Sequence, residues 1–505
     1  MRSKQAVKNI ITSLFQQVVT LICGLIVPRA IIGAFGSSVN GLTSSITQFL
    51  SYITLLEAGI GPVIKSLLYK PIANKDKGQI EKILKASQRF FRVIAIIFII
   101  YLVILCFVYP MIVSNEFETG YTISLILIIA ISTFAEYFFG MIYRLYLQAE
   151  QKTYVTSSIQ IITTILNTIV VVVLIALGTN IQIVKIGSAF VFVLRPILQG
   201  IYVKKKYNIN LKNVTEKYNI KQKWDGLAQH IASVVHNNVD TAIITIFCGT
   251  TEVSVYTVYL FVVNGIKNLV QALTGGIDSS FGDMLARKEY DNLNRSFRTY
   301  ELFYFTLITI VYIVAMVMIV PFIQVYTRGI TDANYIRPLF AILIVLAELV
   351  WAIRLPYSSI TLAAGHFKET KVGAWVEALT NLILSIILVF KFGIIGVTIG
   401  TLVAMTIRTI EFMYHTSKYI LKRPKKQNII RVLILAIQVV IIAPIEINII
   451  QSIEFNSYFI WIIVAGIMCI VNFAIIGIIN GIIYRKDLKD LWNMSKRIFK
   501  GKGVV

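Results

Sequence analysis

Charged residues are scarce in this chain of 505 residues: they make up 14% of the sequence, whereas hydrophobic residues make up 57%. A soluble protein keeps about a quarter of its residues charged, so the composition excludes that class. The mean hydropathy is +0.76, and the apolar residues form long runs such as 90–113 and 303–326. Because a helix needs roughly 20 apolar residues to cross a bilayer, we expect an all-α, polytopic membrane protein.

Cysteine and phosphate-binding loops are also scarce. The four cysteines lie far apart inside apolar runs, which excludes a disulfide framework and provides no metal-ligand cluster. The segment GIGPVIKS lacks the second glycine of a phosphate loop and ends an apolar run. The polar segment 204–228, of about 25 residues, is too short to bury a core. We therefore expect no enzyme activity, no cofactor and no metal. Energy for any transport would come from an ion gradient, the membrane potential or cargo supply.

The apolar runs predict fourteen membrane spans. The first is expected to be retained rather than cleaved as a signal peptide, because the apolar stretch after MRSKQAVKN is long and lacks a clear small-residue cleavage site. The predicted spans are 10–32, 40–62, 92–113, 121–145, 155–177, 181–203, 229–248, 255–282, 302–326, 336–362, 372–390, 393–415, 430–450 and 458–483.

Basic residues outnumber acidic ones and give a net charge of +23. If the N-terminus is cytoplasmic, both termini and the even-numbered connections hold 37 of the 48 lysines and arginines, whereas the odd-numbered connections hold only Arg328 and Lys391. This asymmetry is the positive-inside pattern, so both termini are expected in the cytoplasm. The charge is spread over short segments that face anionic lipid headgroups, which argues against nucleic-acid binding.

An internal repeat relates the two halves of the chain at an offset of about 215 residues. EAGIGPVIKSLLYKPIANKDKGQIEKIL aligns with TGGIDSSFGDMLARKEYDNLNRSFRTY, and ILNTIVVVVLIALGTNIQIVKIGSAF aligns with LTNLILSIILVFKFGIIGVTIGTLVA. The aligned pairs are Asn167 with Asn381, Gly178 with Gly393 and Gly187 with Gly400. Six spans per repeat predict two bundles in parallel orientation, 1–213 and 214–428. Residues 429–505 would add two helices and a basic tail.

Polar residues inside the predicted spans form stripes. In the eighth span, Asn264, Lys267, Gln271, Gly275 and Asp278 follow a helical spacing on one face, and the rest of that helix is apolar. An ionised side chain at mid-bilayer costs ~3 kcal/mol. We therefore expect this face to meet water or a partner.

Three further spans carry a matching polar face: Ser233, Asn237 and Asp240 in the seventh, Ser13, Gln16 and Thr20 in the first, and Ser44, Thr47, Ser51 and Thr54 in the second. Glu57 lies beside the face of the second span, before the Gly-Ile-Gly-Pro segment 59–62, where the helix can bend or end. The simplest arrangement turns spans 1, 2, 7 and 8 toward a central hydrated cavity between the two bundles.

Other charges inside spans can be structural pairs as readily as functional groups. Arg408 and Glu411 share a helix face and can neutralise each other, and Glu136 and Arg144 can pair within the fourth span. The remaining ones are Arg29, Arg195, Glu348, Arg354 and Glu377.

Three segments resemble bacterial polysaccharide flippases, the polysaccharide transporter family of the multidrug/oligosaccharidyl-lipid/polysaccharide (MOP) flippase superfamily. They are VNGLTSSITQFLSYITLLEAGIGPVIKSLLYKPIANKDKGQIEKIL, HIASVVHNNVDTAIITIFCGTTEVSVYTVYLFVVNGIKNLVQAL and AAGHFKETKVGAWVEALTNLILSIILVFKFGIIGVTIGTLVA. The resemblance covers most of residues 1–420 and implies a V-shaped pair of six-helix bundles that works by alternating access. The implied cargo is a lipid-linked oligosaccharide of the undecaprenyl-diphosphate type, carried from the inner to the outer leaflet of the bacterial plasma membrane.

The predicted count of fourteen spans resembles that of the lipid II flippases, in which two extra helices form a groove for the lipid tail. In this sequence the first two spans hold Arg29 as their only arginine, whereas that branch has several cavity arginines. The departure favours a capsule, O-antigen or teichoic-type glycan. The cavity residues expected to bind the cargo are Arg29, Lys267, Asn264, Gln271 and Asn237. Glu57, Asp240 and Asp278 are expected to bind a coupling proton or Na⁺.

Other functions remain open. A cation-coupled multidrug antiporter of the same superfamily would share the cavity and the repeat, although such proteins usually stop at twelve spans. A membrane-embedded glycosyltransferase or polymerase is disfavoured, because the predicted outer connections are roughly ten residues or fewer. Either enzyme could instead be a partner in the same pathway. A scaffold without transport activity would have no need for polar stripes in lipid.

Overall fold

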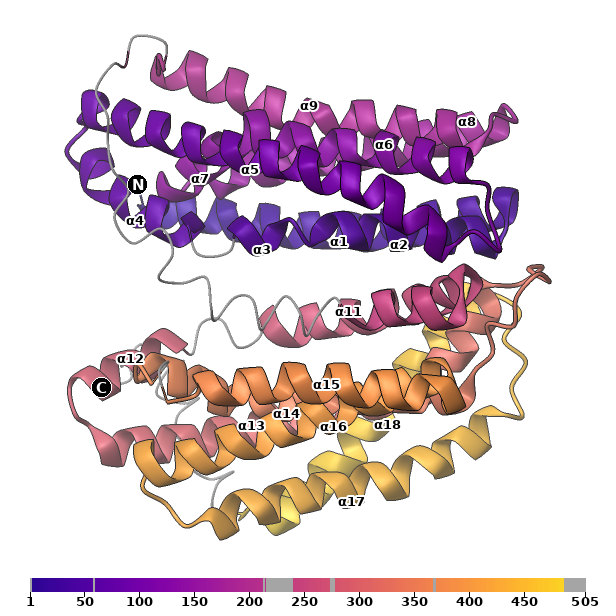
Figure 1. Ribbon diagram of the computed structural model, residues 1–505. Coiled ribbons are helices and arrows are strands. Elements are labelled where there is room, and N and C mark those ends of the chain that lie inside the picture. The colour runs from indigo at the N-terminus through magenta and orange to yellow at the C-terminus, as the bar shows by residue number, and fades with distance from the viewer. Residues whose placement is uncertain are drawn as a thin grey trace. The chain divides into compact units, whose positions relative to one another are not determined.

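The structure, a computed structural model, describes residues 2–57, 60–211, 214, 239–272, 278–366 and 369–485. These residues form helices joined by short connections, with no strand among them. The all-α fold predicted from composition is therefore confirmed. The described chain forms two compact units, residues 1–257 and 258–505, and the division falls inside helix α11 (Figure 1).

Twelve helices of the described chain are long and apolar enough to cross a membrane, and each overlaps one of the fourteen predicted spans. Of the two other predicted spans, 229–248 is described only from Val239, as the apolar helix Val239–Cys248. The other, 40–62, is not one continuous helix. The helix stops near Tyr52, before a separate turn, and a further helix begins at Ile60. Residues 58 and 59, at the start of the predicted bend, lie outside the described residues.

Unit 1 begins with seven helices, the last of which is a π-helical turn. Gly36, at φ 88°, separates the first two helices, and Asp76 caps the fifth through the backbone N–H of Gln79. These helices are α1 Arg2–Phe35, α2 Ser37–Ser51, α3 Thr54–Glu57, α4 Ile60–Ala73, α5 Lys77–Ile112, α6 Thr119–Ala135 and the π-helical turn η1 Glu136–Gly140.

The rest of the first half continues with α7 Met141–Ala149, α8 Thr153–Ala176 and α9 Ile181–Tyr207. Helix α8 packs against α1 and α9, and α9 also packs against α6 and η1. These contacts bring polar positions on α1, α6–α7, α8 and α9 around one interior space.

A polar seam joins α2 to residues 239–257 within unit 1. A methyl group at Gly41 would lie 1.7 Å from the carbonyl oxygen of Thr250, so only glycine permits this approach. Asn40 donates a hydrogen bond to Ser254 Oγ at 2.8 Å. Thr250, the first residue of α11 (Thr250–Ala272), donates its backbone N–H to Glu116 Oε1 at 3.1 Å. Helix α11 is therefore capped by a carboxylate from the α5–α6 connection.

Unit 2 is built around α13 (Tyr290–Tyr326), whose most apolar stretch is 78% buried, the largest buried share among the long apolar helices of the described chain. Glu301 on this helix is fully buried and pairs with Arg423 at 2.8 Å and Arg431 at 2.7 Å. These bonds hold α17 against α13. The other helices are α12 Asp278–Ala286, α14 Pro338–Ala363, α15 Lys371–Phe392, α16 Ile394–His415, η2 Thr416–Ile420, α17 Lys425–Ile450 and α18 Tyr458–Ile483.

The helix pairs α8–α9 and α15–α16 share the features that the repeat predicts. Each pair is joined by a glycine with positive φ, Gly178 at 70° and Gly393 at 56°. Each second helix has a glycine where it meets the first: a methyl group would lie 2.8 Å from Leu174 at Gly187, and 2.4 Å from Ser385 Oγ at Gly400. Glycine at these positions allows close helix packing in a membrane.

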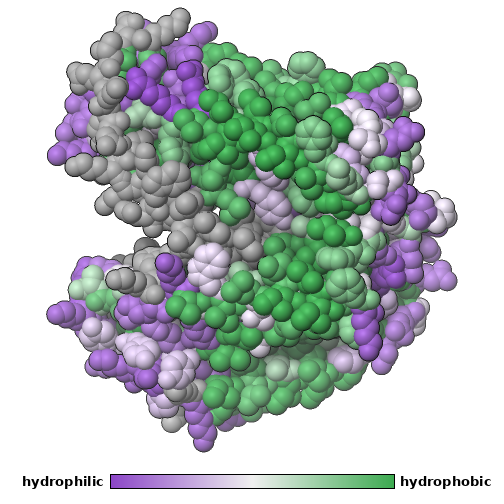
Figure 2. All heavy atoms as spheres, viewed as in Figure 1, coloured by the Kyte–Doolittle hydropathy of each residue, from purple (hydrophilic) through white to green (hydrophobic). Residues whose placement is uncertain are grey.

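The surface matches a lipid-facing protein. Large apolar side chains such as Phe107, Met111 and Phe190 are 68%, 76% and 71% exposed. Figure 2 shows apolar residues across the middle of the helices and hydrophilic residues toward their ends. Since soluble proteins seldom expose such large apolar patches, the chain is a multi-pass membrane protein.

Candidate functional site

Unit 1 contains a cavity of about 650 Å³. Its wall consists of side chains from α1, α3, the α6–η1–α7 stretch, α8 and α9. Four of these elements belong to helices of membrane-spanning composition, yet most of the residues that face the cavity are polar. Polar groups within the bilayer must be satisfied by protein or water, and a cavity of this size has room for a cluster of water molecules.

The π-helical turn η1 places a carboxylate at the cavity wall. Glu136 begins this turn and Gly140 ends it. A methyl group at Gly140 would lie 2.5 Å from Cβ of Pro196 in α9 and 2.9 Å from Oε2 of Glu136. The glycine therefore lets α9 approach while leaving room for the carboxylate. Single π turns inside α-helices are frequent at functional sites.

An ion triad lies on the wall of this cavity. Arg144 NH2 is 3.3 Å from Glu57 Oε1, and Arg144 NH1 is 3.2 Å from Glu136 Oε1. Tyr137 donates its hydroxyl to Glu57 Oε2 at 2.9 Å. One guanidinium therefore serves two carboxylates, as its planar set of donors allows. The predicted pairing of Glu136 with Arg144 is confirmed, with Glu57 as an additional partner.

A second arginine balances the remaining carboxylate charge. Arg195 Nε donates to Thr163 Oγ1 at 2.7 Å, and its NH2 donates to Thr164 Oγ1 at 2.9 Å. Its guanidinium also lies 4.3 Å from the centroid of the Phe192 ring. Two carboxylates and two guanidinium groups line the cavity, so its formal charge is zero.

Neutral polar side chains complete the wall. Eight of them carry a hydroxyl or primary amide that makes no side-chain hydrogen bond within the described part of the chain. They are Ser13, Gln16, Thr133, Gln148, Thr153, Ser157, Gln160 and Gln199. Each can both donate and accept hydrogen bonds. The cavity therefore combines paired charges with unpaired neutral groups.

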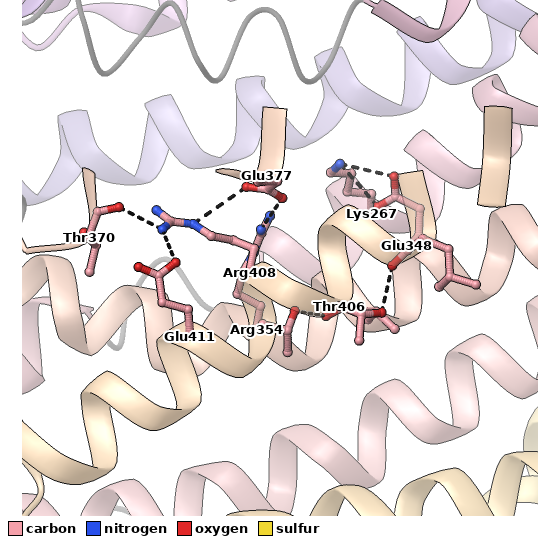
Figure 3. Close-up of polar contacts among 11 residues, drawn as sticks. Lys267, Glu348, Arg354, Thr370, Glu377, Thr406, Arg408 and Glu411 are labelled. Carbon is pink, nitrogen blue, oxygen red and sulfur yellow. Dashed lines mark hydrogen bonds and ion pairs between the residues drawn. The ribbon is translucent and has the colours of Figure 1, made fainter. Parts of the chain in front are cut away.

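Unit 2 holds a different cluster of charges, shown in Figure 3. Lys267 of α11 lies 3.2 Å from Glu348 Oε2 of α14, and its ammonium is 4.5 Å from the centroid of the Trp351 ring. The side chain of Glu348 is 8% exposed and that of Lys267 is 19% exposed. The lysine predicted to neutralise the cargo is thus already paired.

A longer network joins α14, α15 and α16. Arg354 bonds Glu377 at 2.6 Å, and Arg408 lies 3.7 Å from Glu377 and 2.6 Å from Glu411. Arg408 also donates to the carbonyl oxygen of Thr370 at 2.8 Å (Figure 3). The predicted pair of Arg408 and Glu411 is confirmed, and the neighbouring charges are structural partners.

Six predicted site residues have described side chains, and Glu57 alone among these lines the unit 1 cavity. Asn264 and Gln271 lie exposed on α11, and Arg29 is half-buried in α1. The described cavity lies inside unit 1, where α8 and α9 pack against α1 and α6. The common cavity of spans 1, 2, 7 and 8 stays a prediction.

The other predictions fall on or beside residues that are not described. Asp240 is 7% exposed and accepts a hydrogen bond from Tyr256 at 3.1 Å. Asn237, Gly275 and the side chain of Asp278 lie outside the described part of the chain. Their roles stay predictions.

Sequence reasoning missed most of the cavity wall. Thr153, Ser157 and Gln160 are spaced three or four residues apart along α8, and Gln199 lies four residues after Arg195, a charge already noted in the sequence, on α9. Such spacing places residues on one helix face, so the signal was present. These neutral residues stand out less in the sequence than the charges of the four spans expected to line the cavity.

Comparison with known proteins supports the fold but gives no family. No family model matches the sequence, and no curated protein matches it. Among solved structures, the lipid II flippase MurJ in an inward closed conformation has a TM-score of 0.67 at 16% identity and covers 95% of this chain and 99% of its own.

Multidrug transporters also share the fold. An inward-facing MATE family transporter of the MOP superfamily has a TM-score of 0.61 at 14% identity, over 80% of this chain and 94% of its own. The Vibrio cholerae MATE transporter VcmN in its bent form has a TM-score of 0.53 at 17% identity, over 85% and 99%. The chain therefore has the fold of MOP superfamily transporters.

Proposed function

We propose that this protein is a flippase that carries a lipid-linked oligosaccharide from the inner to the outer leaflet of the bacterial plasma membrane by alternating access, for cell-surface polysaccharide assembly. The observation that carries the proposal is the polar cavity of about 650 Å³ inside an apolar, lipid-facing unit. A polar head group cannot cross the hydrocarbon core without such an environment. The resemblance of three segments to polysaccharide flippases supplies the cargo class.

The organisation of the chain supports a lipid-linked cargo. We propose two six-helix bundles, 1–213 and 214–428, with α17 and α18 as an added pair in 429–505. The lipid II flippase structure covers 95% of the chain and the inward-facing multidrug transporter covers 80%. The added pair α17 and α18 therefore fits the larger coverage by the lipid II flippase better than the smaller coverage by the multidrug transporter.

Cargo contacts are assigned to the cationic and amide groups predicted from the sequence: Arg29, Lys267, Asn264, Gln271 and Asn237. A diphosphate is anionic, so it can compete with Glu348 for Lys267, which lies 3.2 Å from that carboxylate. Binding would then exchange one partner of the lysine for another, without exposing an unpaired ammonium to the membrane.

Ion coupling is assigned to Glu57, Asp240 or Asp278. Glu57 shares Arg144 with Glu136, so a proton or Na⁺ on one carboxylate would leave the guanidinium to the other. That change alters the bonds between α3, η1 and α7, which is the kind of local charge change that biases a bistable element.

A cation-coupled multidrug antiporter of the same superfamily is the second candidate. It is favoured by the MATE structures with the same fold and by the two carboxylates of the cavity. Against it, the cavity has no net negative charge to attract an organic cation, and the described wall offers only two aromatic rings, Tyr137 and Phe192.

Reconstitution separates the two candidates. The purified protein is placed in liposomes with a fluorescent polyprenyl-diphosphate oligosaccharide, and its transfer is followed by loss of fluorescence to a membrane-impermeant quencher. Transfer well above that of protein-free liposomes is expected. Protein-dependent movement of organic cations with no transfer of the lipid-linked glycan would instead establish the antiporter.

A further inference from the structure

We propose that the unit 1 cavity is the binding site for the glycan head of the cargo and that it recognises neutral, polyhydroxylated sugar rings rather than the diphosphate. The proposal rests on the function proposed above for the nature of the cargo. It specifies the part of the cargo that enters this cavity and the side chains that bind it.

The unpaired groups of the wall match sugar hydroxyls. Every one of the eight unpaired wall residues defined above offers a hydroxyl or a primary amide, and the four glutamines among them come from α1, α7, α8 and α9. A sugar hydroxyl also donates and accepts, so it can pair with either kind of group in either direction. Groups placed on four helices around one space can contact different hydroxyls of the same ring.

The charges of the wall disfavour a diphosphate. Arg144 is bonded to Glu57 and Glu136, at 3.3 and 3.2 Å. A phosphate that approached this guanidinium would meet two carboxylates, and like charges in close contact are unfavourable. Arg195 is held by two threonine hydroxyls and adds only enough charge to make the wall neutral. Phosphate recognition needs cations with free donors.

Two buried atoms of the wall indicate a missing partner. Gln199 is 5% exposed, and its Oε1 has no hydrogen-bond partner in the described structure; Arg144 Nε also has none. Buried polar atoms without partners are rare and require an explanation. Both residues line the same cavity, so a ligand bound there can supply the missing partners once the two side chains turn toward it.

The cavity also has the size and shape for sugars. Its volume of about 650 Å³ lies within the usual range for ligand pockets, roughly 300–1,000 Å³. Tyr137 and Phe192 contribute aromatic faces, which can contact the apolar face of a sugar ring. The site therefore offers hydrogen-bonding groups and apolar contact without a net charge.

Equilibrium binding with two probes tests the proposal. One probe is a short-chain polyprenyl diphosphate that carries a neutral trisaccharide, and the other is the same polyprenyl diphosphate without sugar. Binding is measured on the full chain in lipid nanodiscs. The variants are Gln160→Leu and Gln199→Leu, with Ser157→Ala as a milder change of the same wall. Gln79→Leu is the matched control, because Gln79 is exposed outside the cavity.

The wild type should bind the sugar-bearing probe more tightly than the bare one. Each glutamine variant should weaken the sugar-bearing probe about fivefold, the loss expected for one hydrogen bond, and Ser157→Ala should weaken it less. The bare probe should be unaffected, and Gln79→Leu should change neither.

Equal binding of both probes by the wild type would overturn sugar recognition while leaving the flippase proposal standing. Unchanged affinity of the sugar-bearing probe in folded Gln160→Leu and Ser157→Ala proteins would overturn the assignment to this cavity. Binding of neither probe to the wild type would instead reject the proposed function and this inference with it.

Discussion

The two units treat charged side chains within the membrane in opposite ways. In unit 2, the side chains of Arg354, Glu377 and Arg408 are 12%, 10% and 7% exposed and are paired with one another and with Glu411. In unit 1, the side chains of Glu57 and Arg144 are 20% and 37% exposed and face a cavity. A charge in a span is therefore not sufficient to indicate a site. The informative signal is a cavity whose neutral polar groups lack partners.

The largest effect should come from breaking the network of unit 2. Glu377→Leu leaves Arg354 without the carboxylate that it bonds at 2.6 Å, and an unpaired buried charge costs ~3–5 kcal/mol. Glu136→Gln in unit 1 should cost only about 1 kcal/mol, because Glu57 still pairs with Arg144 and the cavity has room for water beside the new amide. Unfolding in mixed micelles measures both changes, and equal losses would contradict the comparison.

Two glycines next to the charge clusters provide the next test. The new methyl group of Gly140→Ala would clash with Pro196 and push α9 away from η1. The variant should therefore be destabilised by ~1–3 kcal/mol. At Gly373 the new methyl would meet the side-chain ends of Glu411 and Arg408. Glu411 is 31% exposed and can swing away, so Gly373→Ala should cost under ~1 kcal/mol. A larger loss of stability for Gly373→Ala than for Gly140→Ala in the same unfolding assay would show that the side chains of Glu411 and Arg408 cannot move aside.

The Lys267–Glu348 pair separates a structural role from cargo binding. Glu348→Leu alone should be strongly destabilising, whereas the double variant Lys267→Met/Glu348→Leu should recover most of the stability, because both buried charges are gone. If Lys267 binds cargo, the folded double variant transfers little lipid-linked glycan. Wild-type transfer by that variant would remove Lys267 from the predicted cargo site.

The smallest change in stability should follow substitution on the exposed face of α11. Asn264→Ala should alter the free energy of unfolding by less than ~0.5 kcal/mol, because Asn264 is exposed. Slower glycan transfer with unchanged stability would support its predicted role in cargo binding. Unchanged glycan transfer by Asn264→Ala would show that the polar stripe of α11 serves only to contact water.

Much of the fold could be predicted because a membrane span depends mainly on the local composition of the sequence. Helices α17 and α18 begin and end close to the predicted 430–450 and 458–483. The break near Tyr52 was missed, since Ser51-Tyr52-Ile53 carries neither glycine nor proline. Hydrogen bonds from Tyr137 and Arg144 stabilise Glu57 beyond that break, and such partners cannot be identified from the local sequence.

The site was harder to predict because it depends on which helices pack together. Lys267 and Glu348 are 81 residues apart, and each looks like an isolated charge in the sequence. Gln160 and Gln199 look like minor polar residues in apolar helices until α8 and α9 are placed around one space. A polar stripe can be read from a sequence, whereas its partner requires the packing.

The most direct test of the account is a density map of the full chain with a bound lipid-linked oligosaccharide in a lipid nanodisc. The account predicts sugar density inside unit 1, within hydrogen-bond distance of Gln160 and Gln199, with the diphosphate outside that cavity. Sugar density elsewhere, with the unit 1 cavity filled by water alone, would contradict it.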